Sequence, residues 1–293
     1  MNEEKEKYIN PFTDFGFKKL FGEEPNKDLL IDFLNELLKS KQKIKNLTYG
    51  KLEKLGDIVE ERKAVYDLYC EDEEGKKFIV EIQKAKQDFF KDRTIFYSTF
   101  PIREQARKGS KWNFELKSVY TIGILDFCFD DEDKDKTVVN EVKLMDTKKR
   151  TVFYDKLTYI YIQMPNFTKT EKELTTHFDK WLYVLKNLHK FQDHPKILKE
   201  KIFKKLFKIA EISNFTKEEY EEYERSLKSY RDLQNTIDYK YKIGRKEGRK
   251  EEKNYIATEM IKNGEINDKI LKYTNLSIEE IEKLRKEIEN SDK

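Results

Sequence analysis

Three polar residues, Asp67, Glu81 and Gln83, are the side chains in this sequence whose type and spacing could do chemistry. Residues 77–83, KFIVEIQ, alternate in the manner of a strand, so Glu81 and Gln83 leave an otherwise apolar strand on the same face. Residues 61–70 predict a second strand, and the EDEEG segment between the two predicts a turn. The resulting hairpin brings Asp67 near Glu81 or its neighbour, in a register that the sequence leaves open.

Paired carboxylates of this kind favour a metal site. Two carboxylates on one sheet face repel each other unless a cation neutralises them. Magnesium prefers oxygen ligands and usually takes one or two carboxylates together with substrate phosphate. Asp67 and Glu81 therefore suit metal-assisted phosphodiester cleavage, in which the metal activates water and stabilises the leaving oxygen. Acidic residues on half-exposed strands are also common without any catalytic role, and the pattern alone leaves that interpretation open.

The elements that must position this hairpin predict a mixed α/β domain. Residues 10–22 predict a short helix capped by Thr13, and an amphipathic helix follows Pro25. Residues 86–108 predict a further helix, which Pro101 should kink or interrupt. Three more segments have the apolar content of strands: 118–127, 151–155 and 157–164.

The strand signals stop after Pro165. Helical spacing then recurs in three segments, 171–190, 196–211 and 216–242. The next stretch, KIGRKEGRKEEK, is charged and has no apolar periodicity, which fits either a linker or a solvated helix. We therefore expect four parts: a core at 1–165, a helical extension at 166–241, the charged linker or solvated helix at 242–253, and a small helical tail at 254–293.

Composition limits the classes of protein that remain. Charged residues make up 40% of the chain, but aromatic residues make up 13%, which is enough for a buried core and argues against disorder throughout. The formal net charge of +3 says little about partners. The two cysteines make no disulfide framework, and the three histidines show no zinc spacing. With no signal peptide or membrane-spanning run in view, we expect a cytoplasmic protein without a membrane partner.

The string NPFTDFGFKKLFG, the following DLLIDFLNELL, and Asp67 with Glu81-Ile82-Gln83 resemble the recombination-promoting nuclease / putative transposase family of the PD-(D/E)XK superfamily. The resemblance covers most of the chain and is least distinctive near 165–235. It implies an α/β fold with a PD-(D/E)XK restriction-endonuclease-like core, a mixed sheet flanked by helices, followed by a helical C-terminal region. It also implies an endonuclease that cleaves duplex DNA with Mg²⁺ or Mn²⁺ and that is linked to DNA recombination or mobile elements.

The same resemblance implies roles for the hairpin residues. Asp67 takes the place of the motif's aspartate, Glu81 that of its second carboxylate, and the backbone carbonyl of Ile82 is an additional candidate metal ligand. Gln83 stands where the superfamily usually has lysine, although glutamine is usual in this family. An uncharged amide cannot stabilise a transition state as an ammonium does, but it could orient the attacking water. Two further carboxylates stay outside this catalytic set, one in a helix cap and one on a solvated helix face: Asp14 and Glu36.

A local excess of basic residues follows the hairpin. Residues 84–117 hold nine lysines and arginines against four acidic residues. Such a cluster can contact DNA phosphates without reading bases, or can be an ordinary solvated face. The residues that we expect to bind DNA are Arg93, Arg103, Arg107 and Lys108.

The tail superficially resembles a helix-turn-helix, but its last helix is acidic. From Ile278 onward it carries five glutamates against three basic residues, which would repel phosphates. We therefore expect this apolar-striped helix to pack against its own tail or to bind a protein partner or a second copy of the chain. Two functions compete with the endonuclease: a catalytically degenerate nuclease fold that acts as a DNA-binding or protein-interaction module, and a helical protein-binding scaffold, which the alternating strands disfavour.

Overall fold

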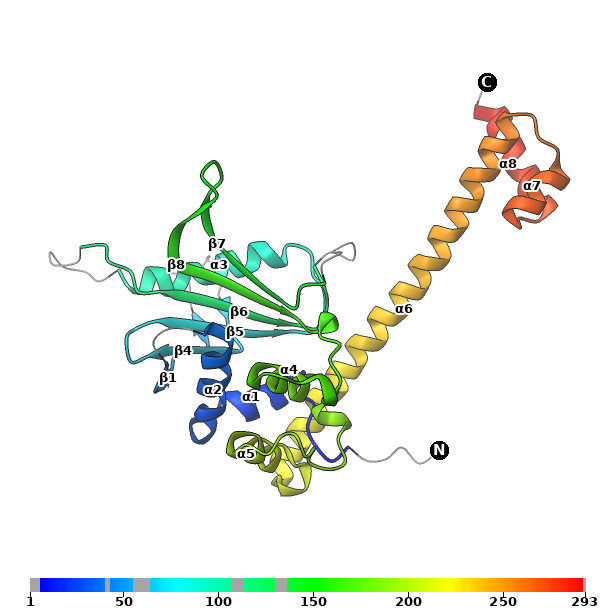
Figure 1. The fold of residues 1–293 in the computed structure, drawn as a ribbon. Helices are drawn as coiled ribbons and strands as arrows, with labels where there is room; N and C mark the ends of the chain where they lie inside the picture. Colours follow the sequence, from blue (N-terminus) through cyan, green and yellow to red (C-terminus); the bar gives the residue numbers. More distant parts are fainter. Residues whose placement is uncertain (1–5, 40–42, 55–63, 107–112, 130–135, 292–293) are drawn as a thin grey trace. The chain divides into compact units, whose positions relative to one another are not determined.

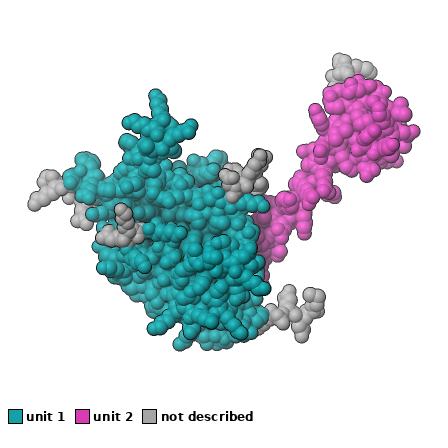
Figure 2. All heavy atoms as spheres, in the orientation of Figure 1, with its two compact units in different colours: residues 1–230 teal, residues 231–293 magenta. Residues whose placement is uncertain are grey.

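The computed structural model describes residues 6–39, 43–54, 64–106, 113–129 and 136–291 (Figure 1). The chain divides into two compact units, residues 1–230 and residues 231–293 (Figure 2). Among the helices of the described segments, none combines the length and the apolar content that crossing a membrane requires.

A mixed sheet is the centre of the first unit. Its six strands lie in the order β1 (Leu47–Tyr49), β4 (Leu68–Asp72), β5 (Lys77–Gln83), β6 (Val119–Leu125), β8 (Thr151–Gln163) and β7 (Val139–Asp146). β5, β6 and β8 run parallel, and the outer pairs are antiparallel. Two short strands, β2 (Glu53–Lys54) and β3 (Ala64–Val65), form a separate ladder. The expected mixed sheet flanked by helices is thus confirmed.

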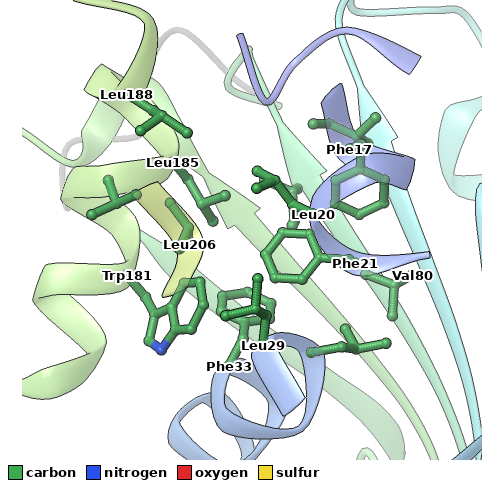
Figure 3. Packing of buried hydrophobic residues seen from close by; sticks show 14 of the residues in the cluster. Phe17, Leu20, Phe21, Leu29, Phe33, Val80, Trp181, Leu185, Leu188 and Leu206 are labelled. Carbon is green, nitrogen blue, oxygen red and sulfur yellow. The ribbon is translucent and has the colours of Figure 1, made fainter. Parts of the chain in front are cut away.

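Helices cover both faces of this sheet (Figure 1). One face packs against α1 (Asp14–Phe21), α2 (Lys27–Leu38), α4 (His177–Asn187) and α5 (Lys201–Ala210). Figure 3 shows Phe21, Phe33 and Trp181 in this core, with Val80 of β5 on the side of Phe21. Complete burial of one such side chain stabilises the fold by about 1.5–3 kcal/mol. The main core therefore holds one face of β5 in place.

The opposite face packs against α3 (Phe90–Glu104), which connects the parallel strands β5 and β6. Ile79 of β5 packs here with Phe100. Two hydroxyl pairs attach α3 to β8: Thr94 with Tyr161 and Ser98 with Tyr159, each at 2.8 Å. The alternation predicted for residues 77–83 is confirmed, because Phe78, Val80 and Ile82 belong to the main core while Ile79 faces α3.

Several predicted elements differ from those observed. The two strands expected at 151–155 and 157–164 are one continuous strand, β8. Its antiparallel partner β7 escaped prediction because its side chains are half-buried or exposed, so no apolar alternation marks it. α3 continues through Pro101 and ends at Glu104, short of the predicted 108. Part of the strand predicted at 61–70 lies in residues 55–63, outside the described residues.

The C-terminal helices begin with α6 (Lys217–Lys262), which starts within the first unit. It is a single helix, so residues 242–253 are helical. In the second unit, α7 (Asn267–Thr274) and α8 (Ile278–Ser291) pack on the end of α6 around Ala257, Ile270 and Ile281. Short 3₁₀ turns occur at Glu24–Asn26, Met164–Asn166, Glu171–Glu173, Leu188–Lys190 and Ile212–Asn214. The expected helical C-terminal region is confirmed.

Candidate active site

The candidate site begins where the β4–β5 ladder ends. The last backbone pair of this antiparallel ladder joins Leu68 to Val80, so the next position would set Asp67 opposite Glu81. Strand alternation stops at this point, because Tyr66 and Tyr69 both pack on the α3 side with ring centroids 5.5 Å apart. The chain therefore bends at Asp67, immediately before β4 begins at Leu68. The Asp67 side chain lies against the end of β5, at Ile82.

Beyond the Leu68–Val80 pair, side-chain carboxylates accept the hydrogen bonds of the backbone N–H groups. The backbone N–H of Ile82 donates to Asp67 Oδ2 at 2.7 Å. The backbone N–H of Asp67 donates to Glu81 Oε1 at 3.1 Å. The expected approach of Asp67 to Glu81 is thus present, and each carboxylate has a second oxygen, Oδ1 or Oε2, that could take a cation.

The electrostatics of the pair are unfavourable without positive charge. Burial raises the pKa of the Glu81 carboxyl to about 8, and the charge of Asp67 adds to this rise, whereas Arg93 opposes it. Burial also raises the pKa of Asp67, although the hydrogen bond from the Ile82 N–H favours its charged form. Two neighbouring carboxylates that resist ionisation together form a site that a cation would stabilise.

The backbone carbonyl of Ile82 faces the same edge. Its own N–H donates to Asp67, and a strand residue presents its N–H and C=O to the same side. The carbonyl of the next residue, Gln83, points the other way and accepts the N–H of Asp126 at 2.9 Å. The chain therefore brings two carboxylates and one carbonyl to the end of β5.

Gln83 lies beside the pair but is held by an arginine. Its Oε1 accepts a hydrogen bond from Arg93 of α3 at 2.6 Å, and its Nε2 donates to the carbonyl of Ala85 at 3.0 Å. The guanidinium of Arg93 also donates to Gln87 at 2.7 Å. The rings of Phe90 and Tyr97 lie beneath this guanidinium. The cation Arg93 is therefore held next to Gln83, the position at which the superfamily motif usually has lysine.

Asp14, which sequence reasoning left outside the catalytic set, lies close to the site. It is the first residue of α1, and Thr13 caps this helix by accepting the N–H of Gly16 at 3.0 Å. Its Oδ1 forms an ion pair with Lys84 at 2.7 Å, and its charge contributes to the raised pKa of Asp67. The only sequence signal for this proximity was its place in the DFGFKK string of the N-terminal resemblance.

The remaining predicted positions fall in different places. Arg103 is exposed near the end of α3, more than two helical turns along the helix from Arg93. Arg107 and Lys108 lie outside the described residues. Glu36 is partly buried on α2.

A divalent cation fits the donors that are present. Within the described ranges, no group of three or more His, Cys, Asp or Glu side chains is arranged for a metal. Magnesium does not need such a cage, because one or two carboxylates with water and substrate phosphate complete its oxygen shell. Asp67, Glu81 and the Ile82 carbonyl are oxygen donors of that kind, and burial raises the pKa of both carboxyls.

Comparison with known proteins identifies one family. The family model described as PD-(D/E)XK nuclease family transposase matches residues 11–240. No curated protein and no solved structure shows significant similarity to the chain. The matched range contains the whole hairpin, α1, α3 and the sheet, so the resemblance drawn from the N-terminal string and the hairpin is confirmed.

Proposed function

The chain belongs to the PD-(D/E)XK nuclease family transposases, and from this membership we propose that it is a divalent-metal-dependent endonuclease that hydrolyses phosphodiester bonds of duplex DNA. The observation that carries the proposal is the carboxylate pair Asp67 and Glu81 at the end of β5, linked by the Asp67 N–H and partly buried. The description of the family as transposases supports a link to recombination or mobile elements.

The residues that would hold the metal are Asp67, Glu81 and the backbone carbonyl of Ile82. When bound, Mg²⁺ or Mn²⁺ supplies a Lewis acid for the phosphate and lowers the pKa of water. The chain's own contribution is to keep both carboxylates at one sheet edge, with Asp67 oriented by the Ile82 N–H. The packed core beneath β5 limits movement of these ligands.

Arg93 is the cation nearest to the glutamine of the motif. Because Gln83 cannot carry positive charge, we assign Gln83 the role of orienting Arg93, or water, toward the phosphate. The planar guanidinium donates from several N–H groups, so hydrogen bonds to Gln83 and Gln87 leave capacity for a phosphate oxygen. This arrangement supports transition-state stabilisation in place of the usual lysine.

Arg103, Arg107 and Lys108 remain the proposed contacts to DNA phosphates beyond the site. They are expected to position the duplex without reading its sequence. Neutralising them should weaken the binding of unrelated DNA sequences equally and reduce its salt dependence.

The decisive experiment is cleavage of a supercoiled plasmid by the purified chain with Mg²⁺, Mn²⁺, Ca²⁺ or chelator. Asp67→Asn and Glu81→Gln preserve shape and hydrogen-bond acceptors, so they should remove cleavage while the melting temperature stays near that of the wild type. Glu74→Gln is the matched control, because Glu74 lies in the turn of the same hairpin and pairs with Lys76 at 2.5 Å. Cleavage by all four proteins at equal rates would remove the assignment.

The competing function is that of a degenerate nuclease fold that binds DNA or protein without cutting it. The feature that favours it is Gln83 in place of lysine. Its signature would be DNA binding that survives in Asp67→Asn together with the absence of metal-dependent cleavage in the wild type.

A partner for the tail is a separate proposal. Ile281, Leu284 and Ile288 of α8 pack within their own unit, while Ile278 is 45% exposed. Most of the apolar stripe thus has cover from the same chain, which leaves less surface for a second copy or a protein partner. The molar mass of the full chain and of residues 1–241 in solution distinguishes self-association from a monomeric tail.

A further inference from the structure

The second unit contains a cleft whose lining is strongly basic. Its volume is about 550 Å³, and its wall on α6 consists of six cationic side chains: Lys242, Arg245, Lys246, Arg249, Lys250 and Lys253. The other wall comes from Asn275, Leu276 and Glu280, at the junction of α7 and α8. All of these residues lie in the unit of residues 231–293 (Figure 2).

The six cations lie on one helix face because of their spacing. Successive members are separated by steps of one or three residues, which keeps them on adjacent turns of the same side. From the first to the last, the row covers about 16 Å of helix axis. Three glutamates interrupt the run in the sequence, Glu247, Glu251 and Glu252, and none of them lines the cleft. We call this row of six the α6 basic stripe.

The stripe retains its charge within the unit. Among the described side chains, no ion pair involves any of its six members. The one carboxylate of the cleft, Glu280, accepts the backbone N–H of Ser277 at 2.9 Å, and the charges of Lys250 and Lys253 also help to lower its pKa. The repulsion among six neighbouring cations makes a dense anionic ligand the natural occupant.

The chemistry of the lining decides which anionic ligand fits. Leu276 is the single apolar residue among the nine that line the cleft, so there is little surface to bury a peptide's apolar side chains. Lysine and arginine in a regular row instead match a polymer with closely spaced charges, and duplex DNA carries about one charge per 1.7 Å of axis. Among the acidic residues of α8, only Glu280 lines the cleft, against six cations on α6.

We propose that the α6 basic stripe binds the sugar–phosphate backbone of duplex DNA and gives the chain a sequence-independent contact outside the candidate active site. The proposal rests on the proposed function in one respect: DNA is the anionic polymer that a nuclease meets. The stripe adds affinity for phosphates and contributes no cleavage chemistry.

The test measures binding of the full-length chain to two labelled duplexes of unrelated sequence in chelator, across a range of salt concentrations. The stripe variant carries Lys246→Gln, Arg249→Gln and Lys250→Gln. The control carries Lys240→Gln, Lys272→Gln and Lys286→Gln, which remove the same charge from exposed positions outside the cleft. Circular dichroism establishes that both variants keep their helical content.

We expect the stripe variant to lose about 2–3 from the slope of log affinity against log salt, since each phosphate contact contributes about 0.9. Affinity for both duplexes should fall at least about tenfold at low salt, while the control keeps a slope near that of the wild type. Equal slopes for stripe variant and control would overturn the proposal. Displacement of the duplex by polyglutamate of matched charge, or by anionic lipid vesicles, would overturn the assignment to DNA.

Cleavage assays separate this proposal from the endonuclease. Glu81→Gln should lose cleavage and keep the wild-type salt slope, because Glu81 lies outside the second unit. If the wild type does not cut DNA but the stripe variant shows a reduced salt dependence of binding, the endonuclease proposal is contradicted and the stripe proposal is supported. If the wild type cuts DNA but the stripe variant binds DNA with the wild-type salt dependence, the endonuclease proposal is supported and the stripe proposal is contradicted.

Discussion

Glu81 accepts the backbone N–H of Asp67 at 3.1 Å, at the position where the β4–β5 backbone ladder has ended. The second candidate metal ligand therefore also completes the hydrogen bonding of the first. Asp67 in turn accepts the N–H of Ile82. This reciprocal arrangement couples the chemistry of the site to the stability of the sheet edge.

Alanine and amide variants should differ in stability for this reason. Asp67→Ala leaves the Ile82 N–H without its acceptor, which should cost about 1–3 kcal/mol in the free energy of unfolding. Asp67→Asn retains a carbonyl oxygen and should cost less, while both variants lose cleavage. Urea unfolding of the two proteins without metal provides the measurement, and equal destabilisation would show that the hydrogen bond contributes nothing.

The metal-free site should respond to pH through Glu81. Burial, with the charge of Asp67, raises the pKa of Glu81 from 4.5 to about 8, so the folded state holds this proton more tightly than the unfolded state. The unfolding free energy should therefore decrease as pH rises between these two values, and Glu81→Gln should weaken that decrease. Metal binds the ionised form, so Mg²⁺ should raise the melting temperature more at pH 8.5 than at pH 6.

Melting curves at both pH values, with and without Mg²⁺, test this expectation. Glu74→Gln is again the control, because its carboxylate lies in the hairpin turn. A metal-induced shift that is equal at both pH values, or equal in Glu81→Gln and wild type, would contradict the assignment.

Gln83 and Arg93 should act as one unit. If Gln83 orients the guanidinium, Arg93→Ala should reduce cleavage by about 10²-fold, the loss typical of one transition-state donor. Gln83→Ala should lower the rate, and the double variant should be little worse than Arg93→Ala. Gln83→Lys should keep measurable activity and lose less than Gln83→Ala, because lysine is the residue that the superfamily usually has at this position.

Single-turnover cleavage rates of the four proteins form the double-mutant cycle. Lys86→Gln serves as control, since this exposed lysine lies between β5 and α3. Additive losses would separate the roles of the two residues, and wild-type rates in Gln83→Ala would exclude Gln83 from catalysis.

Asp14 should tune the site by charge. Its carboxylate contributes to the raised pKa of Asp67 and pairs with Lys84. Asp14→Asn removes this repulsion, so the pKa of Asp67 should fall. Because the metal binds ionised carboxylates, we expect cleavage to increase with pH, and in this variant the increase should begin at a lower pH. The plateau rate should stay within about threefold, because a difference of that size is well under 1 kcal/mol in the barrier. A loss of Mg²⁺ affinity together with a collapse of the plateau would instead make Asp14 a metal ligand.

Local sequence patterns were enough to predict much of the β4–β5 hairpin. The period-two pattern of KFIVEIQ predicted which side chains face the main core, and the short turn segment placed the strands next to each other. The register was open at that point, because apolar alternation is compatible with more than one pairing. β7 was missed for a related reason: a strand with both faces partly in solvent has no apolar periodicity to detect.

The sequence by itself determined that Asp67 would approach Glu81 or its neighbour, since a hairpin is a local structure whose pairing depends on neighbouring residues. Tertiary structure alone decided that Arg93 would reach Gln83 from α3, and that Asp14 of α1 would pair with Lys84, 70 residues along the chain. These contacts depend on how helices pack against opposite faces of β5. Such packing is set by buried surface accumulated over the whole core, including Phe33 and Trp181, and leaves no local pattern at the residues that it brings together.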